Sequence, residues 1–294
     1  MLKLTEDEYK YQINNISNDE VAKVLFDVLT KIHKVIDSIE IDNDDLIYKT
    51  DIFKVFFKQY NTVLSLIKGT RYVYLEDSQY LDIKSINILT RSLHETYLLY
   101  TFLCFSGTFP EFNKEEEINF KSLSYKYSGE CDNAKTFHLI KSIKHDESNF
   151  QGAEKETQAR KVELWQLIEK TKIYESLSTS MKAELKRGNW KVCPTKKLSW
   201  ADLADYSHLS KDFGKFEYHS MSLYAHSTFS SLQLEANHNN DVHGLMFHCY
   251  VIVSVFSIST LKVLNKTIFD DNLLSKRELS LILEFQGMSQ QKNA

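Results

Sequence analysis

The chain has 294 residues, of which 43% are hydrophobic and 26% are charged, and its formal net charge is −4. This balance is typical of a globular protein and excludes wholesale disorder, and so small a charge excludes a global electrostatic attraction to nucleic acid or anionic lipid. Only two prolines and eight glycines occur, whereas an all-β sandwich or a doubly wound sheet needs many more turn-forming residues. The composition therefore predicts an all-α fold of long helices.

Apolar residues recur at helical spacing along most of the chain, and this pattern predicts a multi-helix bundle. Gly69 follows the second helix and is expected to cap its C-terminal end. The middle of the chain is more charged, and its helical runs are shorter. We expect helices over about 18–36, 46–67, 80–105, 154–177, 211–234, 242–265 and 271–285.

The domain organisation follows from the absence of internal repeats and of low-complexity linkers. We expect a single α-helical domain over residues 1–294, with core helices at about 18–105 and 211–285. The segment at about 111–197 is then a charged helical elaboration of that bundle.

The stretch from Leu245 to Leu264 is about as long as a membrane span, but it carries His248, Lys262 and several hydroxyl side chains. We therefore expect a buried core helix and no membrane. The four cysteines form no Cys-x-x-Cys pair, and the N-terminal residues are polar and acidic, unlike a signal peptide. We expect a cytoplasmic protein with reduced thiols, no cofactor and no metal.

Two polar patterns on separate predicted helices are the candidates for chemistry. Arg91 and Glu95 are four residues apart, so they share a helical face, which also carries the apolar Ile88, Leu98 and Phe102. Two opposite charges inside an apolar stripe are expected to pair with one another or to be satisfied by other groups, because an unpaired buried charge is costly.

The second pattern is a polar row in which Tyr218, Ser222 and His226 step by four residues. If the bundle buries this row, its natural partner is the face that carries Arg91 and Glu95. The two rows would then form a cluster of one fixed cation, one carboxylate, one imidazole and two hydroxyls.

These two motifs resemble a bacterial helical family known only as a domain of unknown function, over about residues 45–265. The positions that match are Arg91, Glu95, Tyr218, Ser222 and His226. The resemblance implies an all-α bundle without an established activity. A weaker similarity is to the HEPN superfamily, helical bundles that include RNA-cleaving toxins and phage-defence effectors. The Arg-x(4–6)-His motif of that superfamily is absent from this sequence.

The residue types in the cluster fit phosphoryl transfer or RNA cleavage through the 2′-hydroxyl. His226 titrates near neutrality and suits a general acid or base, and the planar fork of Arg91 suits a phosphate. Glu95 and Tyr218 would orient these two groups, and Ser222 adds a hydroxyl. The first hypothesis is therefore an RNA-directed defence or toxin-type effector. A non-enzymatic binding or scaffold protein, with a purely structural cluster, and a pocket for a small anionic ligand are the alternatives.

A basic stretch interleaved with tryptophan is the candidate nucleic-acid contact, at Lys186, Arg187, Trp190 and Lys191. Cations next to aromatic rings are typical of surfaces that bind single strands, although a solvated charged face has the same composition. RNA is thus the partner that the sequence favours, and a homodimer is left open.

Overall fold

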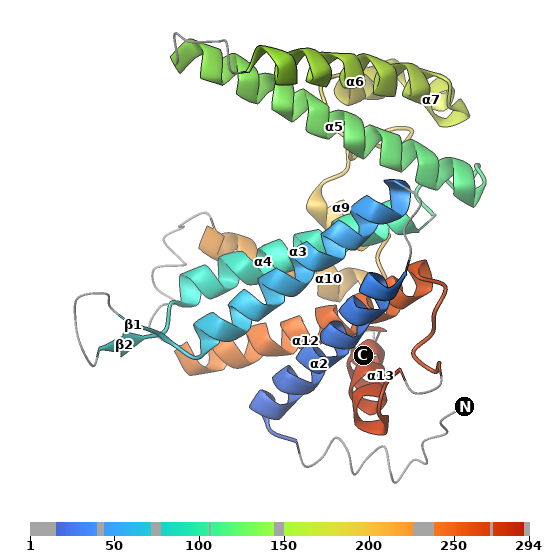
Figure 1. Cartoon of the computed structure of the whole chain (residues 1–294). Coiled ribbons are helices and arrows are strands. Elements are labelled where there is room, and N and C mark those ends of the chain that lie inside the picture. Colours follow the sequence, from blue (N-terminus) through green and yellow to red (C-terminus); the bar gives the residue numbers. More distant parts are fainter. Residues whose placement is uncertain are drawn as a thin grey trace. The chain divides into compact units, whose positions relative to one another are not determined.

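A computed structural model describes residues 16–39, 44–71, 78–105, 107–143, 150–225, 238–270 and 273–290 (Figure 1). Within these ranges the regular elements are helices, apart from a pair of two-residue antiparallel strands, β1 (Thr70–Arg71) and β2 (Gln79–Tyr80), and an isolated antiparallel bridge between Val192 and Lys197. The all-α prediction is confirmed. The helices are α2 (Asn18–Ser38), α3 (Asp44–Ile67), α4 (Ile83–Cys104), α5 (Lys114–Ile143), α6 (Gln151–Glu169), α7 (Lys172–Ser176), α8 (Thr179–Lys186), α9 (Trp200–Ala204), α10 (Lys211–Ala225), α12 (His238–Val263) and α13 (Lys276–Gln290).

The chain forms two compact units. Unit 1 consists of Met1–Thr101 with Ser207–Ala294, and unit 2 consists of Phe102–Tyr206. Unit 2 covers the segment that the sequence marks as a charged elaboration. That the whole chain behaves as a single domain stays a prediction.

Helix α12 is the core of unit 1, where it packs against α13, α2 and α3. Its Phe256 ring stacks on Phe56 of α3, with 3.7 Å between ring centroids, and also contacts Phe53 and Tyr100. Among the described residues, one helical segment is long and apolar enough to span a membrane, Val242–Val263. Of its most apolar 18-residue stretch, 83% is buried inside the protein. Its apolar character is therefore accounted for by packing within unit 1.

Local sequence signals set the ends of the first helices. The Ser17 hydroxyl accepts a hydrogen bond from the N–H of Glu20 and caps α2. Gly69 adopts a positive φ of 94° and donates its N–H to the carbonyl of Leu66, which ends α3 as the sequence predicts.

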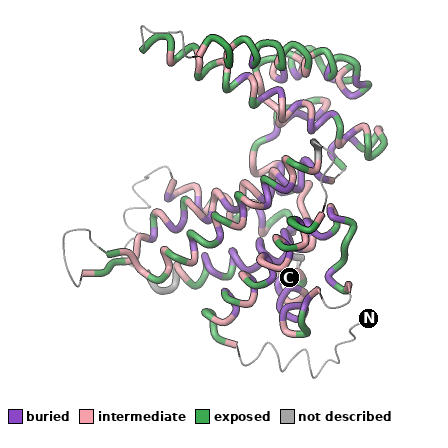
Figure 2. The backbone as a smooth tube through the Cα atoms, viewed as in Figure 1, coloured by how far each residue is buried: buried purple, intermediate pink, exposed green. Residues whose placement is uncertain are grey.

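Unit 2 is built on a hairpin of α5 and α6. The sequence predicts shorter helical runs here than in the rest of the chain and does not single out α5, which has 30 residues. The predicted helix at about 154–177 is divided into α6 and α7, because Thr171 is extended, with φ −80° and ψ 141°, and its hydroxyl caps α7. Helix α6 is exposed along most of its length, and only Thr157 and Ile168 are buried in it (Figure 2).

A buried ion pair ties the start of α5 to the loop after α4. Glu117 and Lys121 are each 1% exposed and contact one another one turn apart. The Glu117 carboxylate also accepts hydrogen bonds from the backbone N–H groups of Gly107 and Thr108, at 2.8–3.1 Å, and the Lys121 ammonium donates to the carbonyl of Phe105. Burial alone would raise the pKa of Glu117, but Lys121 and the two N–H groups outweigh it and hold the pKa below its ordinary value.

The substitution Lys121→Met tests this ion pair. It keeps an apolar stem but leaves the buried Glu117 carboxylate without a cation, so the free energy of unfolding should fall by about 3–5 kcal/mol. Urea denaturation of full-length protein measures this change. Lys135→Met removes a lysine from an exposed pair with Asp132 on the same helix and should leave the stability nearly unchanged. Equal losses in the two variants would show that the Glu117–Lys121 pair is not buried in solution.

Candidate functional site

Helix α4 presents Arg91 and Glu95 on one face, one helical turn apart. The Arg91 Nε donates to the Glu95 Oε1 at 3.0 Å, so the predicted pairing of these two charges is confirmed. The side chains are 19% and 25% exposed, and the pair is therefore only partly shielded from water. On the apolar stripe that the sequence assigns to this face, Leu98 and Phe102 are buried, but Ile88 is 40% exposed.

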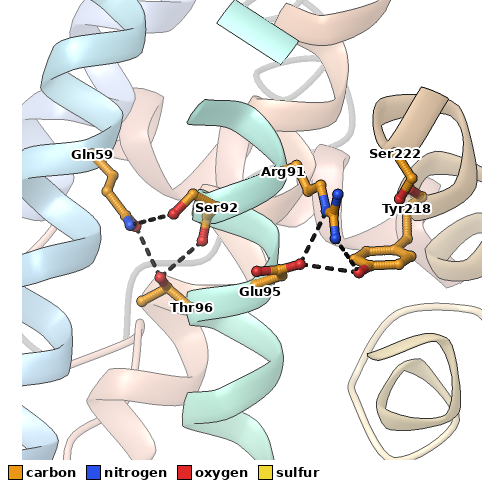
Figure 3. A network of polar contacts seen from close by, with 7 residues as sticks. All are labelled: Gln59, Arg91, Ser92, Glu95, Thr96, Tyr218 and Ser222. Atoms are coloured by element: carbon orange, nitrogen blue, oxygen red, sulfur yellow. Dashed lines mark hydrogen bonds and ion pairs between the residues drawn. The ribbon is translucent and has the colours of Figure 1, made fainter. Parts of the chain in front are cut away.

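Tyr218 of α10 closes a triangle with this pair (Figure 3). The Arg91 Nη2 donates to the Tyr218 hydroxyl at 2.8 Å, and that hydroxyl donates to the Glu95 Oε1 at 3.0 Å. The guanidinium carbon also lies 5.0 Å from the centroid of the Tyr218 ring. Each of the three polar groups therefore contacts the other two, and residues 127 positions apart in the sequence meet as predicted.

The remaining members of the polar row do not join this triangle. The Ser222 hydroxyl donates to the carbonyl of Tyr218 at 2.7 Å, a bond to the preceding turn that is common for a hydroxyl within a helix. His226 lies outside the described residues, so its predicted place in the cluster stays a prediction.

A second polar network sets the rotation of α4 about its axis. On another face of α4 from the triangle, the amide of Gln59 in α3 donates to the Ser92 hydroxyl, and the Thr96 hydroxyl donates to the Gln59 Oε1, both at 2.9 Å (Figure 3). Ser92 and Thr96 therefore face α3, while Arg91 and Glu95 face α10.

Three ionisable side chains that the sequence does not single out as a set lie next to the triangle, on α4, α10 and α12. The rings of His94 and His248 are fully buried with 5.0 Å between centroids, and the His94 ring lies 6.1 Å from the ring of Tyr218. No hydrogen-bond partner reaches the ring nitrogens of either histidine in the described structure. The Glu217 Oε2 lies 3.8 Å from the His248 Nδ1.

Burial controls the charge of these three groups. It lowers the pKa of His94 from 6.5 to about 3. Burial, and then the neighbouring His94, lower the pKa of His248 well below its ordinary value. Burial raises the pKa of the Glu217 carboxyl from 4.5 to about 7. Both imidazoles are therefore neutral at physiological pH, and Glu217 is the group that exchanges a proton there. Within the described ranges, no set of three His, Cys, Asp or Glu side chains is arranged to hold a metal ion.

The four residues of the predicted nucleic-acid contact lie in unit 2 in different environments. Arg187 pairs with Glu184 at 2.8 Å, and the Lys186 ammonium lies 6.0 Å from the ring centroid of Trp165. Trp190 packs on Phe102, Tyr125 and Trp200. The Lys191 ammonium lies over Trp200, 4.0 Å from its ring centroid. The Lys191 ammonium also lies 5.6 Å from the ring centroid of Trp190, and the nucleic-acid contact of these four residues stays a prediction.

The chain belongs to a family of unknown function, DUF5677, which it matches over residues 52–243. The matched segment contains every residue of the Arg-x-x-x-Glu and Tyr-x-x-x-Ser-x-x-x-His motifs, and the resemblance to a helical family of unknown function is confirmed at that level. The match gives no support to the similarity with the HEPN superfamily. No curated protein and no solved structure shows significant similarity to the chain.

Tyr218→Phe tests the triangle, because it removes both hydrogen bonds of the hydroxyl while keeping the ring. We expect the free energy of unfolding to fall by about 1–2 kcal/mol, since hydrogen bonds to charged groups are worth more than neutral ones but this site is partly exposed. Urea denaturation measures the loss. Ser222→Ala, which removes only a bond to the preceding turn, should cost less than about 0.5 kcal/mol. A Tyr218→Phe variant as stable as the wild type would mean that α10 does not dock on α4 through this triangle.

Glu217 should make stability depend on pH. Its pKa is higher in the folded protein than in the unfolded chain, so the protonated carboxyl favours folding, and this contribution disappears as the pH rises from about 4.5 to about 7. In Glu217→Gln, which cannot ionise, this loss is absent. The free energy of unfolding of the variant, relative to that of the wild type, should therefore rise by about 2 kcal/mol between about pH 5 and pH 8. Denaturation series at several pH values measure this change. Stability curves that stay parallel would contradict the raised pKa.

Proposed function

We propose that the protein is an RNA-directed phosphoryl-transfer enzyme of the defence or toxin type, whose phosphate-binding residue is Arg91. The observation that carries the proposal is a partly exposed guanidinium held in place by Glu95 and Tyr218. The residue before Tyr218 in α10, Glu217, adds a carboxyl group whose pKa burial raises to about 7. Such a combination of a preorganised cation and an acid–base group is what cleavage at a phosphodiester requires.

The hydrogen bonding of Arg91 leaves room for an anion. A guanidinium carries five N–H donors, and the hydrogen bonds among the described residues use two of them, one to Glu95 and one to Tyr218. The planar fork is held in one orientation by these partners and retains donors for the oxygens of a phosphate. Glu95 and Tyr218 are thus positioning residues for Arg91.

Glu217 supplies the proton-transfer group that the cluster otherwise lacks among the described residues. It is adjacent to Tyr218 in α10, its side chain is 21% exposed, and its pKa of about 7 suits an acid or base at neutral pH. Cleavage through the 2′-hydroxyl needs one group to take the proton of that hydroxyl and another to give a proton to the leaving oxygen. We assign these roles to Glu217 and to the predicted His226, without an order between them.

A non-enzymatic binding or scaffold protein is the second candidate, and the closed triangle favours it. Arg91, Glu95 and Tyr218 satisfy one another, as the members of a structural network do. The two candidates differ in what a conservative substitution changes, since a structural network acts on stability and a catalytic site acts on rate.

The test measures cleavage of labelled single-stranded RNA and thermal stability in the same variants. Arg91→Lys keeps the charge but loses the fork, and Glu217→Gln and His226→Ala remove proton transfer. Each should lower the cleavage rate by about 100-fold or more while the protein stays folded. The control Arg277→Lys alters the exposed Arg277–Glu20 ion pair in unit 1 and should leave the rate unchanged. A wild-type protein that cleaves no RNA, or three variants that cleave like the wild type, would overturn the enzyme proposal.

A further inference from the structure

Three aromatic rings from three helices of unit 2 pack together, with a lysine ammonium near each. The ring of Trp165 in α6 contacts Tyr127 of α5 and Tyr174 of α7, with 5.1 and 5.6 Å between ring centroids. Three ammonium groups lie 5.0–6.0 Å from these centroids. They belong to Lys161 over Tyr127, Lys182 over Tyr174 and Lys186 over Trp165. We call these six residues the lysine–aromatic face.

The lysines of this face differ from many other cations of unit 2 in lacking an acidic partner. Lys135, Lys141 and Lys196 pair with carboxylates at 2.6–2.8 Å. None of Lys161, Lys182 and Lys186 forms an ion pair with a carboxylate in the part of the chain that the structure describes, and the Lys182 ammonium donates to the backbone carbonyl of Glu175. Their positive charge is therefore available to an anion from outside the protein.

The rings are fixed in place but not fully covered. Trp165 and Tyr174 are half-buried against the apolar core of unit 2. The Trp165 indole N–H donates to the Glu169 Oε1 at 2.7 Å, which fixes the orientation of the ring and places one carboxylate at the edge of the face. The Tyr127 ring is buried beneath them and contributes support rather than contact surface.

We propose that the lysine–aromatic face binds single-stranded RNA. Unpaired bases stack on exposed aromatic rings and their phosphates pair with lysine, whereas a duplex hides the faces of its bases. The contact predicted from the sequence is less suited to RNA, because two of its residues already have partners within the protein. The Trp190 ring packs on Phe102, Tyr125 and Trp200, and Arg187 is paired with Glu184. Of that set, Lys186 belongs to the new face. The inference rests on the proposed function for its choice of RNA.

Fluorescence anisotropy of a labelled single-stranded RNA with full-length protein tests the proposal. The double variant Lys182→Gln/Lys186→Gln should weaken binding by about 10-fold or more and reduce the slope of log Kd against log salt by about 1. The matched control Lys196→Gln/Lys197→Gln removes the same charge from side chains that pair with Asp202 and Glu184, and binding should change less than about 2-fold. Equal weakening in both double variants would overturn the proposal, as would a wild-type protein that binds no RNA.

Stacking is tested separately with an abasic strand of the same length and charge. The wild-type protein should bind the abasic strand more weakly than the normal strand, and Trp165→Leu should reduce that difference. Polyphosphate that competes as well as the normal strand would overturn the assignment to RNA and identify a general polyanion surface. If cleavage depends on Arg91 but the double variant binds RNA as tightly as the wild type, only this inference fails. If binding depends on the lysines but no RNA is cleaved, only the enzyme proposal fails.

Discussion

A partly buried guanidinium needs acceptors for the N–H groups that water does not reach, and Arg91 has acceptors on two helices. Glu95 lies one turn further along α4, and Tyr218 is brought by α10. The Gln59 network joins one side of α4 to α3, and the triangle joins another side of α4 to α10 through the Tyr218 hydroxyl. The position of α10 in turn brings Glu217 next to the buried His248.

This arrangement separates two kinds of polar group in unit 1. The triangle is hydrogen-bonded and reachable by water, whereas His94 and His248 are buried and neutral. The Glu217 side chain is less buried than the two histidines, and its burial raises the pKa of the carboxyl to about 7. The proposed phosphate chemistry would use both the fixed cation of Arg91 and the proton-exchanging carboxyl of Glu217, which lie in the same unit. A structural role alone explains the triangle, but it gives no reason for an ionisable carboxyl at Glu217.

The parts of the site that depend on local spacing could be predicted from the sequence. Arg91 and Glu95 share a face because they are four residues apart, and the helical period brings the Tyr218 row to them. The pKa of Glu217 could not be predicted in this way, because it results from burial among helices that are distant in the chain. For the same reason Glu117, one of three consecutive glutamates, resembles a solvated charge run, yet it is buried with Lys121.

The interaction partners of the basic stretch could not be predicted from the sequence either. Lys186 is four residues from Trp190 in the sequence, but its ammonium lies over Trp165, which only the packing of α8 against α6 reveals. Helix α5 was missed as a continuous helix because its charged and polar residues hide the apolar period, and α6 to α8 cover only part of its length. In both cases the decisive contacts are tertiary.

The central claim, that Arg91 binds phosphate, is tested most directly by following the side-chain Nε–H signal of Arg91 in ¹⁵N–¹H spectra. The titrant is a 2′-deoxy dinucleotide, which carries the phosphodiester but lacks the hydroxyl needed for cleavage. The account predicts a saturable shift of this signal, which weakens in Tyr218→Phe because the guanidinium then loses one of the two partners that hold it. A signal that stays unchanged up to saturating dinucleotide would contradict it and leave the triangle as a structural contact between α4 and α10.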